Sequence, residues 1–286
     1  MLQTLFNGLV SGTILSLPAL ALALSFSVLR FANFAIGALI TVGAYIVYGF
    51  NVSLGWPMMI AVPVGMLVTA LVAILSDLAV FLPLRKRSSI TLLVASMGLS
   101  LVLENGVRTI AGSAALGYNV DPMRPWRIGD LRIDPQQIWA MGIVAAALLI
   151  VSIIYQKTRI GRAMRALADD PALAGSRGVR PAVIVAYTWA IVGALAAVAG
   201  VLIGLDTSVD PSMGWNYLLP TFAAAILGGI GSPAAAVGGA LVLGVVQEAA
   251  TLVIPPHYRS LVAFVVMTVL LLVRPSGLFG ARWIKR

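Results

Sequence analysis

Long stretches of the sequence contain no charged residue. They cover residues 1–29, 31–76, 135–156, 181–205 and 211–247. A helix that crosses a bilayer needs about 20 predominantly apolar residues, and a turn signal at Asn51, Gly55 and Pro57 divides the second stretch. The pattern predicts helices near residues 3–29, 33–50, 57–81, 90–110, 136–155, 182–205, 218–229, 234–254 and 258–274.

The segment near 218–229 is too short to cross a bilayer unaided. It ends at the run Leu227-Gly228-Gly229-Ile230-Gly231-Ser232-Pro233, which interrupts a long apolar stretch. Non-helical backbone at membrane depth is tolerated where protein or a water-filled cavity satisfies its polar groups, and broken helices line translocation routes in transporters. An ordinary tight turn on the cytoplasmic side explains the run equally well. We predict an all-α polytopic membrane protein of about 8–9 transmembrane segments with a broken or short helix near 218–233.

Composition supports the same class. The chain has 286 residues, of which 60% are hydrophobic and 10% charged, and its mean hydropathy is +1.01. Soluble domains average about 45–50% apolar and about 25% charged residues. This balance excludes a soluble globular domain and a disordered chain. The length predicts a single transmembrane domain over residues 1–286, and the lack of cysteine excludes disulfides and thiolate metal sites.

The net charge of +9 suggests nucleic-acid binding until the positions of the basic residues are considered. Fourteen of the nineteen Lys and Arg fall on one side of the predicted spans: Arg30, Arg85, Lys86, Arg87, the six in 157–180, Arg274, Arg282, Lys285 and Arg286. Cytoplasmic loops of membrane proteins are enriched in Lys and Arg. We therefore expect the N-terminus outside, the C-terminus in the cytoplasm, contact with the lipid bilayer and no nucleic-acid partner.

Catalytic and metal-binding patterns are missing from the sequence. The single histidine, His257, has no cysteine or carboxylate cluster near it in the sequence. There is no G-x-S-x-G motif, and none of Lys86, Lys157 and Lys285 follows a glycine as in a phosphate-binding loop. We expect no enzyme activity, no catalytic residue, no metal and no cofactor bound by this chain. If ATP drives its function, a partner subunit hydrolyses it.

Three acidic residues lie within the predicted spans, where ionisable groups are costly and indicate function by default. Asp77 is near the basic cluster 85–87, which favours a helix-terminal or interfacial role. Glu104 is followed four residues later by Arg108, a favourable helical pair, so a structural role is expected. Glu248 is the candidate for a pathway or gating residue, although a buried glutamate bonded to a neighbouring helix explains it at least as well.

The loop 156–181 contains helix-favouring residues at 161–168. Asp169 or Asp170 is expected to cap a second short helix that begins at Pro171, and Gly175 and Gly178 to end it. Paired short helices between spans are typical of a docking element for a soluble partner. A basic loop on anionic lipid is the other interpretation, and composition does not decide between them.

The longest predicted outer loop covers residues 111–135. Its residues 126–133 alternate polar and apolar side chains around Gly129-Asp130, which predicts a hairpin. Three interpretations of this loop are open: it covers a membrane pore, it contacts an external partner, or it packs on itself. We favour the last.

Five groups of motifs, spread from residue 33 to 280, resemble one family closely. They are Asn33-Phe34-Ala35-x-Gly37 with Gly43-Ala44-Tyr45; Met97-Gly98-Leu99-Ser100 with Leu103-Glu104-Asn105; Arg162-Ala163-x-Arg165-Ala166 with Asp170-Pro171; Ile226-Leu227-Gly228-Gly229-Ile230-Gly231-Ser232-Pro233; and Arg274-Pro275-Ser276-Gly277-Leu278-Phe279-Gly280. Together they resemble the permease subunit of ATP-binding-cassette (ABC) importers for branched-chain and other hydrophobic amino acids.

This resemblance implies a multi-pass protein of the bacterial inner (cytoplasmic) membrane. Its expected partners are ATP-binding-cassette subunits, a second permease subunit that is a paralogue or a second copy, an external substrate-binding protein and a small-molecule substrate. The expected coupling interface with the ATPase consists of Arg162, Met164, Arg165, Asp169, Asp170 and Pro171. The candidates for the translocation pathway or gate are Asn33, Gly228, Gly229, Gly231 and Glu248.

The resemblance does not determine which substrate the protein carries, because members of the family carry different small molecules. Branched-chain amino acids are the base expectation, and urea, short amides and aromatic or carboxylic acids are alternatives within the same family. A carrier or channel driven by an ion gradient without an ATPase is the alternative from another class. Sparse intramembrane charge argues against it, because proton coupling usually uses chains of Asp, Glu or His.

Overall fold

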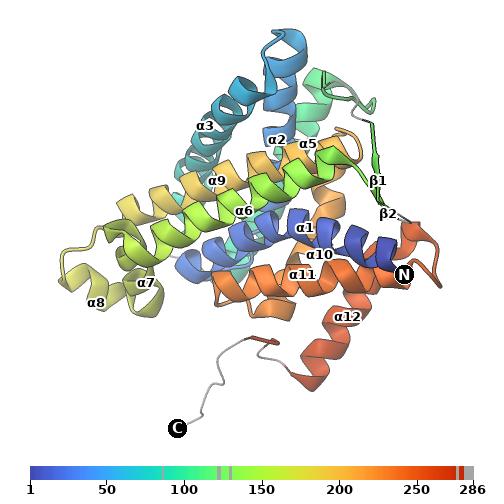
Figure 1. Ribbon diagram of the computed structural model, residues 1–286. Coiled ribbons are helices and arrows are strands. Elements are labelled where there is room, and N and C mark those ends of the chain that lie inside the picture. The colour runs from blue at the N-terminus through green and yellow to red at the C-terminus, as the bar shows by residue number, and fades with distance from the viewer. Residues whose placement is uncertain (86, 121–123, 129–130, 275–276, 280–286) are drawn as a thin grey trace. The chain divides into compact units, whose positions relative to one another are not determined.

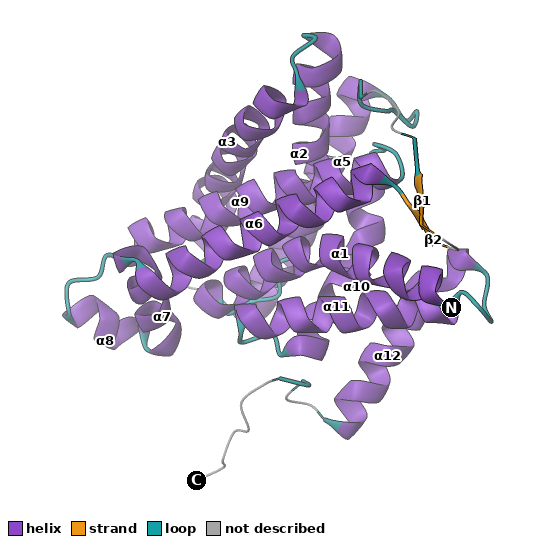
Figure 2. Cartoon of the chain, in the orientation of Figure 1, coloured by secondary structure: helices purple, strands orange, loops and turns teal. Residues whose placement is uncertain are grey.

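The computed structural model describes residues 1–85, 87–120, 124–128, 131–274 and 277–279, and it is mainly helical (Figures 1 and 2). The longer helices are α1 (Leu2–Leu29), α2 (Ala35–Tyr48), α3 (Met58–Ser76), α5 (Ser89–Ala111), α6 (Pro135–Lys157), α7 (Arg159–Asp169), α9 (Pro181–Asp206), α10 (Met213–Gly228), α11 (Pro233–Ala250) and α12 (Arg259–Val273). The shorter elements are η1 (Gly49–Ser53), η2 (Asp77–Phe81), α4 (Leu82–Leu84), α8 (Pro171–Ser176), η3 (Pro256–Tyr258) and the strands β1 (Trp126–Ile128) and β2 (Leu131–Ile133).

Eight helical stretches in the described part of the chain are long and apolar enough to cross a membrane. They are Leu2–Leu29, Ala35–Ser53, Met58–Leu84, Ser89–Ala111, Pro135–Lys157, Pro181–Asp206, Pro233–Ala250 and Pro256–Val273. These match eight of the predicted helices and confirm an all-α polytopic membrane protein.

The ninth predicted helix, near 218–229, is longer than expected. Helix α10 begins at Met213, five residues before the predicted start, and has 16 residues. The helix takes in residues 213–217 as well: the Asn216 amide donates to the Ser212 carbonyl at 3.0 Å. The break after α10 is confirmed, because the helix ends at Gly228 and α11 begins at Pro233.

The chain divides into two compact units, which are described separately. The first consists of Met1–Ala23, Val120–Leu148 and Leu219–Arg286, and the second of Leu24–Asn119 and Leu149–Leu218. The boundaries fall within α1, α6 and α10, so each of these helices contributes to both units. A single domain over residues 1–286 stays a prediction.

Helix α9 is the centre of the second unit. It packs against both α2 and α3, and its residues from Leu195 to Gly204 are all buried. A helix that is apolar on every side is stable only inside other protein or lipid. Close backbone approach makes the packing possible: a Cβ added at Gly43 of α2 would lie 2.5 Å from Cα of Ala197.

In the first unit, a short hairpin lies beside the beginning of α1. Strands β1 and β2 pair antiparallel, with Trp126 opposite Ile133, which confirms the predicted hairpin. Its predicted turn, Gly129-Asp130, lies outside the described residues. The Gln3 side chain donates to the Arg132 carbonyl at 3.0 Å and accepts from the Arg132 amide at 2.9 Å. These two bonds join β2 to α1 within the same unit, and the role of the loop 111–135 stays a prediction.

The contact between α2 and α9 makes a direct prediction. Gly43→Ala should lower the free energy of unfolding by about 1–3 kcal/mol, because the new methyl group meets backbone that cannot move aside cheaply. The measurement is the thermal unfolding midpoint of the purified protein in detergent.

The matched control is Gly98→Ala in α5, where an added Cβ meets no atom within 4 Å. Alanine is the better helix former by about 1 kcal/mol, so this variant should unfold at the same temperature or higher. Equal midpoints for the two variants would contradict the packing described for α2 and α9.

Candidate functional site

The predicted helix pair is present as α7 and α8. The Thr158 hydroxyl caps α7 by accepting from the Gly161 amide at 3.1 Å. Asp170 caps α8: its Oδ1 accepts from the amides of Ala172 at 2.9 Å and Leu173 at 3.0 Å. Pro171 occupies the first helical turn, where its missing N–H costs nothing. Of the two predicted capping residues, Asp170 is therefore the one that caps.

Helix α7 is strongly amphipathic and its apolar face is buried. Met164 is 1% exposed and Leu167 is 4% exposed. Gly161 lies so close to the carbonyls of Ile154 and Tyr155 that a Cβ would clash with them. Met164, expected at the partner interface, therefore contributes to packing inside the second unit rather than to an accessible surface.

Two arginines connect α7 to neighbouring segments: Arg165 joins its middle to the end of α6, and Arg30 binds its C-terminal end. Arg165 donates to the carbonyls of Tyr155 and Gln156, and its guanidinium lies over the Tyr155 ring, 5.3 Å from the centroid. Arg30 donates to the carbonyls of Ala168 and Asp169 at 2.5 and 2.9 Å. Positive charge at helix C-termini is favourable, because the last carbonyls have no intrahelical donor. The helix is thus held as a rigid part of the second unit.

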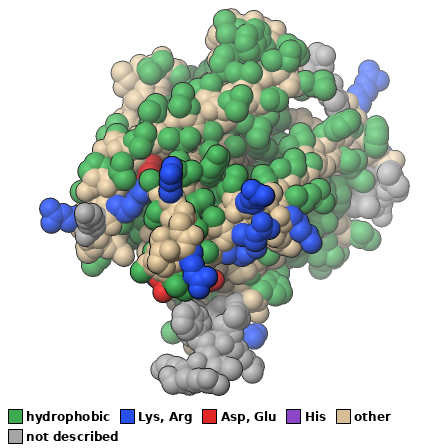
Figure 3. All heavy atoms as spheres, turned by 90° about the vertical axis from the view of Figure 1, so that its left-hand side faces the viewer, with side chains coloured by type: hydrophobic (Ala, Val, Ile, Leu, Met, Phe, Trp, Pro, Cys, Tyr) green, Lys and Arg blue, Asp and Glu red, His purple; other side chains and the backbone are tan. Residues whose placement is uncertain are grey.

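The outer face of the α7–α8 pair combines charge with an apolar side chain. Arg162, Asp169, Asp170 and Pro171 are exposed, and Leu173 is exposed by 56%. Figure 3, which views the side of the molecule where α7 and α8 lie in Figure 1, shows Lys and Arg side chains gathered there. We call the surface of Arg162, Asp169, Asp170, Pro171 and Leu173 the α7–α8 face.

The break between α10 and α11 contains three of the candidate pathway residues. Gly228 ends α10 against Ala235 of α11, where a Cβ would clash with the Ala235 carbonyl. Gly229 has φ of 126°, which favours glycine. Gly231 has open space where a side chain would be. Ser232 then caps α11 by accepting from the Ala235 amide.

Residues 277–279 bind this break, a contact that the sequence analysis missed. The Leu278 amide donates to the Leu227 carbonyl at 2.7 Å, and the Phe279 amide donates to the Gly228 carbonyl at 3.1 Å. These are two of the last carbonyls of α10, which have no donor within the helix. In the sequence, the motif at 274–280 indicates the family resemblance and no contact with another segment. Its backbone pairing leaves no signal in side-chain types that sequence reasoning could have used.

The other candidate pathway residues are buried and have partners. Asn33 accepts from the Ala35 amide at 3.1 Å and donates to the Ser25 hydroxyl at 3.3 Å. Glu248 forms an ion pair with Arg259. Neither contact tests a role in translocation, so these roles stay predictions.

The other two acidic residues in the spans form the expected pairs. Asp77 pairs with Arg85 at 2.7 Å, and Glu104 pairs with Arg108 at 2.9 Å. Among the residues that the structure describes, no group of three or more His, Cys, Asp or Glu side chains could hold a metal ion.

Comparison with known proteins identifies the class and then the family. The family model described as "Branched-chain amino acid transport system / permease component" matches residues 4–271. A polytopic helical protein that matches a permease model over nearly its whole length is a membrane-transport permease. The chain belongs to the family of branched-chain amino acid transport permease components of ABC importers.

Several curated relatives carry related names. The chain is 30% identical to the high-affinity branched-chain amino acid transport system permease protein LivH of Escherichia coli K12, over 98% of this chain and 95% of that protein. It is also 30% identical, with the same coverage, to the permease protein BraD of Pseudomonas aeruginosa. A partial match, 28% identical over 65% of this chain and 59% of that protein, is to the ribose import permease protein RbsC of Escherichia coli K12.

One solved structure has a similar fold. A chain of PsaBC from Streptococcus pneumoniae in complex with Fab aligns with a TM-score of 0.51 at 15% identity, covering 96% of this chain and 92% of that one. At this identity the likeness concerns the fold alone.

The capping of α8 predicts a difference between two neighbouring aspartates. Asp170→Ala should remove the cap and destabilise α8 by about 0.5–2 kcal/mol. Amide hydrogen exchange at residues 172–176 should then be faster than in the unmodified protein.

Asp169→Ala is the control, because the interaction of Asp169 with Arg30 uses its backbone carbonyl and survives the substitution. Equal exchange rates at 172–176 in both variants would show that Asp170 does not hold α8.

Proposed function

We propose that the chain is the permease subunit of an ATP-driven importer in a bacterial inner membrane and that it carries branched-chain or other hydrophobic amino acids. The observation that carries the proposal is the match to the permease family over residues 4–271. Relatives named for branched-chain amino acid transport align over 98% of the chain, which supports the substrate class. Urea, amides and carboxylic acids are the competing substrates to test.

The α7–α8 face is proposed to contact the ATPase. Its exposed Leu173 offers an apolar anchor, and Arg162, Asp169 and Asp170 around it supply charges of both signs. Because Arg165 joins α7 to the end of α6 and Arg30 binds the C-terminal end of α7, movement of a bound ATPase would pass to the helices connected to it rather than be absorbed by a loose loop. The ATPase partner binds and hydrolyses ATP, and this chain needs no cofactor.

The proposed complex has two further protein partners. A second permease subunit, either a paralogue or a second copy, completes the pathway. An external binding protein delivers the substrate. The residues at the break, Gly228, Gly229 and Gly231, together with Asn33 and Glu248, are proposed pathway or gate residues in this complex.

We also propose that the N-terminus is outside and the C-terminus is cytoplasmic. The six spans α1, α2, α3, α5, α6 and α9 then place residues 207–212 outside. The C-terminus is in the cytoplasm if α10 crosses inward, α11 crosses outward and α12 crosses inward again. The pairing of 278–279 with 227–228 supports this path, since it puts the break at the same end of α12 as the C-terminal segment. With 16 residues, α10 is about 24 Å long, which is shorter than the hydrocarbon core of a bilayer, about 30 Å thick.

The coupling proposal is tested by charge reversal on the α7–α8 face. Arg162→Glu combined with Leu173→Asp should reduce both co-purification of the ATPase and ATP-dependent uptake at least about tenfold, because a charge is reversed and an apolar contact is lost at the same surface. The two readouts are pull-down in mild detergent and uptake of labelled leucine. Arg165 is less suitable than Arg162, since its loss also removes the cap of α6.

Arg127→Glu on β1 is the matched control, because it makes the same charge change at an exposed residue of the outer hairpin. Membrane insertion should be normal in all variants. Full ATPase binding and full uptake in the Arg162/Leu173 double variant would refute the proposed contact.

A further inference from the structure

A stripe of polar side chains runs along α5 at intervals of four residues. It consists of Ser96, Ser100, Glu104 and Arg108, which adjoin one another on the helix surface. Ser96 and Ser100 are buried, and Ser96 accepts from the Phe34 amide at 3.0 Å, so the stripe faces the beginning of α2. Side-chain exposure increases along it, to 13% for Glu104 and 40% for Arg108. The stripe therefore leads from the protein interior to the accessible end of α5.

Helix α2 contributes a hydroxyl that lacks a partner. The Tyr45 hydroxyl oxygen is buried, and among the described residues it has no hydrogen-bond partner. Helix α5 packs against α2. Arg108 follows Ser96 by twelve residues and Tyr45 follows Phe34 by eleven, so the bond between Phe34 and Ser96 places Arg108 and Tyr45 at a similar level of the two helices. Asp210 precedes by four residues Gly214, whose amide binds Thr41 one turn before Tyr45. A buried polar atom without a partner is costly, and this one lies at the level of one positive and one negative group.

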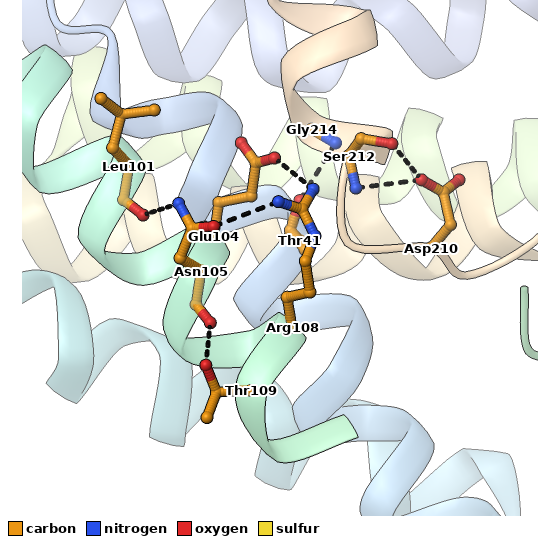
Figure 4. A network of polar contacts seen from close by, with 9 residues as sticks. All are labelled: Thr41, Leu101, Glu104, Asn105, Arg108, Thr109, Asp210, Ser212 and Gly214. Carbon is orange, nitrogen blue, oxygen red and sulfur yellow. Dashed lines mark hydrogen bonds and ion pairs between the residues drawn. The ribbon is translucent and has the colours of Figure 1, made fainter. Parts of the chain in front are cut away.

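Asp210 is held in place by the backbone around it. Its neighbour Val209 forms two hydrogen bonds with Leu116, each 2.9 Å long. Its Oδ1 accepts from the amide of Ser212 at 2.9 Å and from the Ser212 hydroxyl at 2.6 Å. Figure 4 shows this turn together with the Glu104–Arg108 pair. The carboxylate is thus fixed in advance by the fold.

The start of α10 is also fixed against α2. The Gly214 amide donates to the Thr41 hydroxyl at 3.0 Å (Figure 4). Thr41 is one helical turn before Tyr45, so this bond ties the segment that carries Asp210 to the helix that carries the free hydroxyl.

Two more tyrosines surround Tyr45. The Tyr45 and Tyr48 ring centroids are 6.4 Å apart, and those of Tyr48 and Tyr118 are 6.5 Å apart. Tyr118 donates from its hydroxyl to the Ala44 carbonyl at 3.1 Å. Burial raises the pKa of the Tyr118 phenol above its usual value, so the hydroxyl stays protonated and keeps this bond.

We propose that Arg108, Tyr45 and Asp210 form a binding site for a zwitterionic α-amino acid. Arg108 binds the carboxylate, Asp210 binds the ammonium group and the Tyr45 hydroxyl donates to the carboxylate. The inference rests on the proposed function and narrows it, because it selects amino acids over urea and over simple carboxylic acids.

The chemistry of each group supports this assignment. Arginine has five N–H donors, and Arg108 directs two of its terminal nitrogens to Glu104 and Asn105 at 2.9 and 3.1 Å. These bonds orient the guanidinium and leave donors for a ligand carboxylate. A ligand that carries both a carboxylate and an ammonium group can bind Arg108 and Asp210 together, and a ligand that lacks one of these charges loses one of the two contacts.

The test is binding of labelled leucine to the purified complete transporter in lipid nanodiscs, without the external binding protein. The competitors are leucine, leucinamide, which lacks the carboxylate, 4-methylpentanoate, which lacks the amine, and urea. Leucine should bind, and each of the other three should compete at least about tenfold less well, a difference of about 1.4 kcal/mol.

Single variants then assign each charge. Arg108→Gln should weaken leucine binding at least about tenfold and remove the preference for leucine over leucinamide. Asp210→Asn should remove the preference over 4-methylpentanoate. Tyr45→Phe should weaken leucine binding while leaving the unfolding midpoint equal or higher, because it deletes an unpaired buried hydroxyl. Arg108→Lys keeps the charge and should restore part of the affinity, and Arg127→Gln on the outer hairpin should change nothing.

The outcomes separate this inference from the proposed function. Undetectable leucine binding, wild-type affinity in Arg108→Gln and Asp210→Asn, or an equal loss for every ligand would overturn the site. If ATP-driven leucine uptake continues unchanged in those variants, the site is wrong and the proposed function stands. If the unmodified complex transports no amino acid, the proposed function is wrong, and the nanodisc binding result judges the site by itself.

Discussion

Every backbone N–H and C=O inside a bilayer must find a partner within the protein, and the structure depends on this constraint. Helices satisfy it along their length, so the difficult places are their ends. Helix ends on the proposed cytoplasmic side, outside the bilayer, have partners too: Asp170 bonds the start of α8, Arg30 the end of α7 and Arg165 the end of α6. At the end of α10 the amides of Leu278 and Phe279 take this role.

The same constraint connects the fold to the proposed transport cycle. The last carbonyls of α10 need donors where the helix ends, and they obtain them from a segment more than forty positions later in the chain. The α7–α8 face is rigid because helix ends are capped by side chains of the same unit. In contrast, the Tyr45 hydroxyl has no partner among the described residues. A polar group left unpaired in an otherwise satisfied protein is a place where a ligand can contribute a bond.

Much of the fold could be predicted from the sequence, because charge-free stretches and the bilayer thickness leave few choices. Capping chemistry located α8 and its aspartate, and helical spacing located the Glu104–Arg108 pair. The start of α10 was placed five residues too late, since the bond between the Gly214 amide and the Thr41 hydroxyl, which holds this start, joins segments far apart in the sequence. The burial of Met164 and the bond between the Leu278 amide and the Leu227 carbonyl depend on contacts between distant segments, for which local patterns give no signal.

The central claim is that this permease works with an ATPase, and one measurement tests it most directly. The complex purified through this chain is reconstituted in vesicles with the external binding protein, and uptake of labelled leucine is followed with ATP or a non-hydrolysable analogue on the ATPase side. Our account predicts uptake against a gradient with ATP and none with the analogue. Accumulation without ATP, driven by an ion gradient through this chain alone, would contradict it.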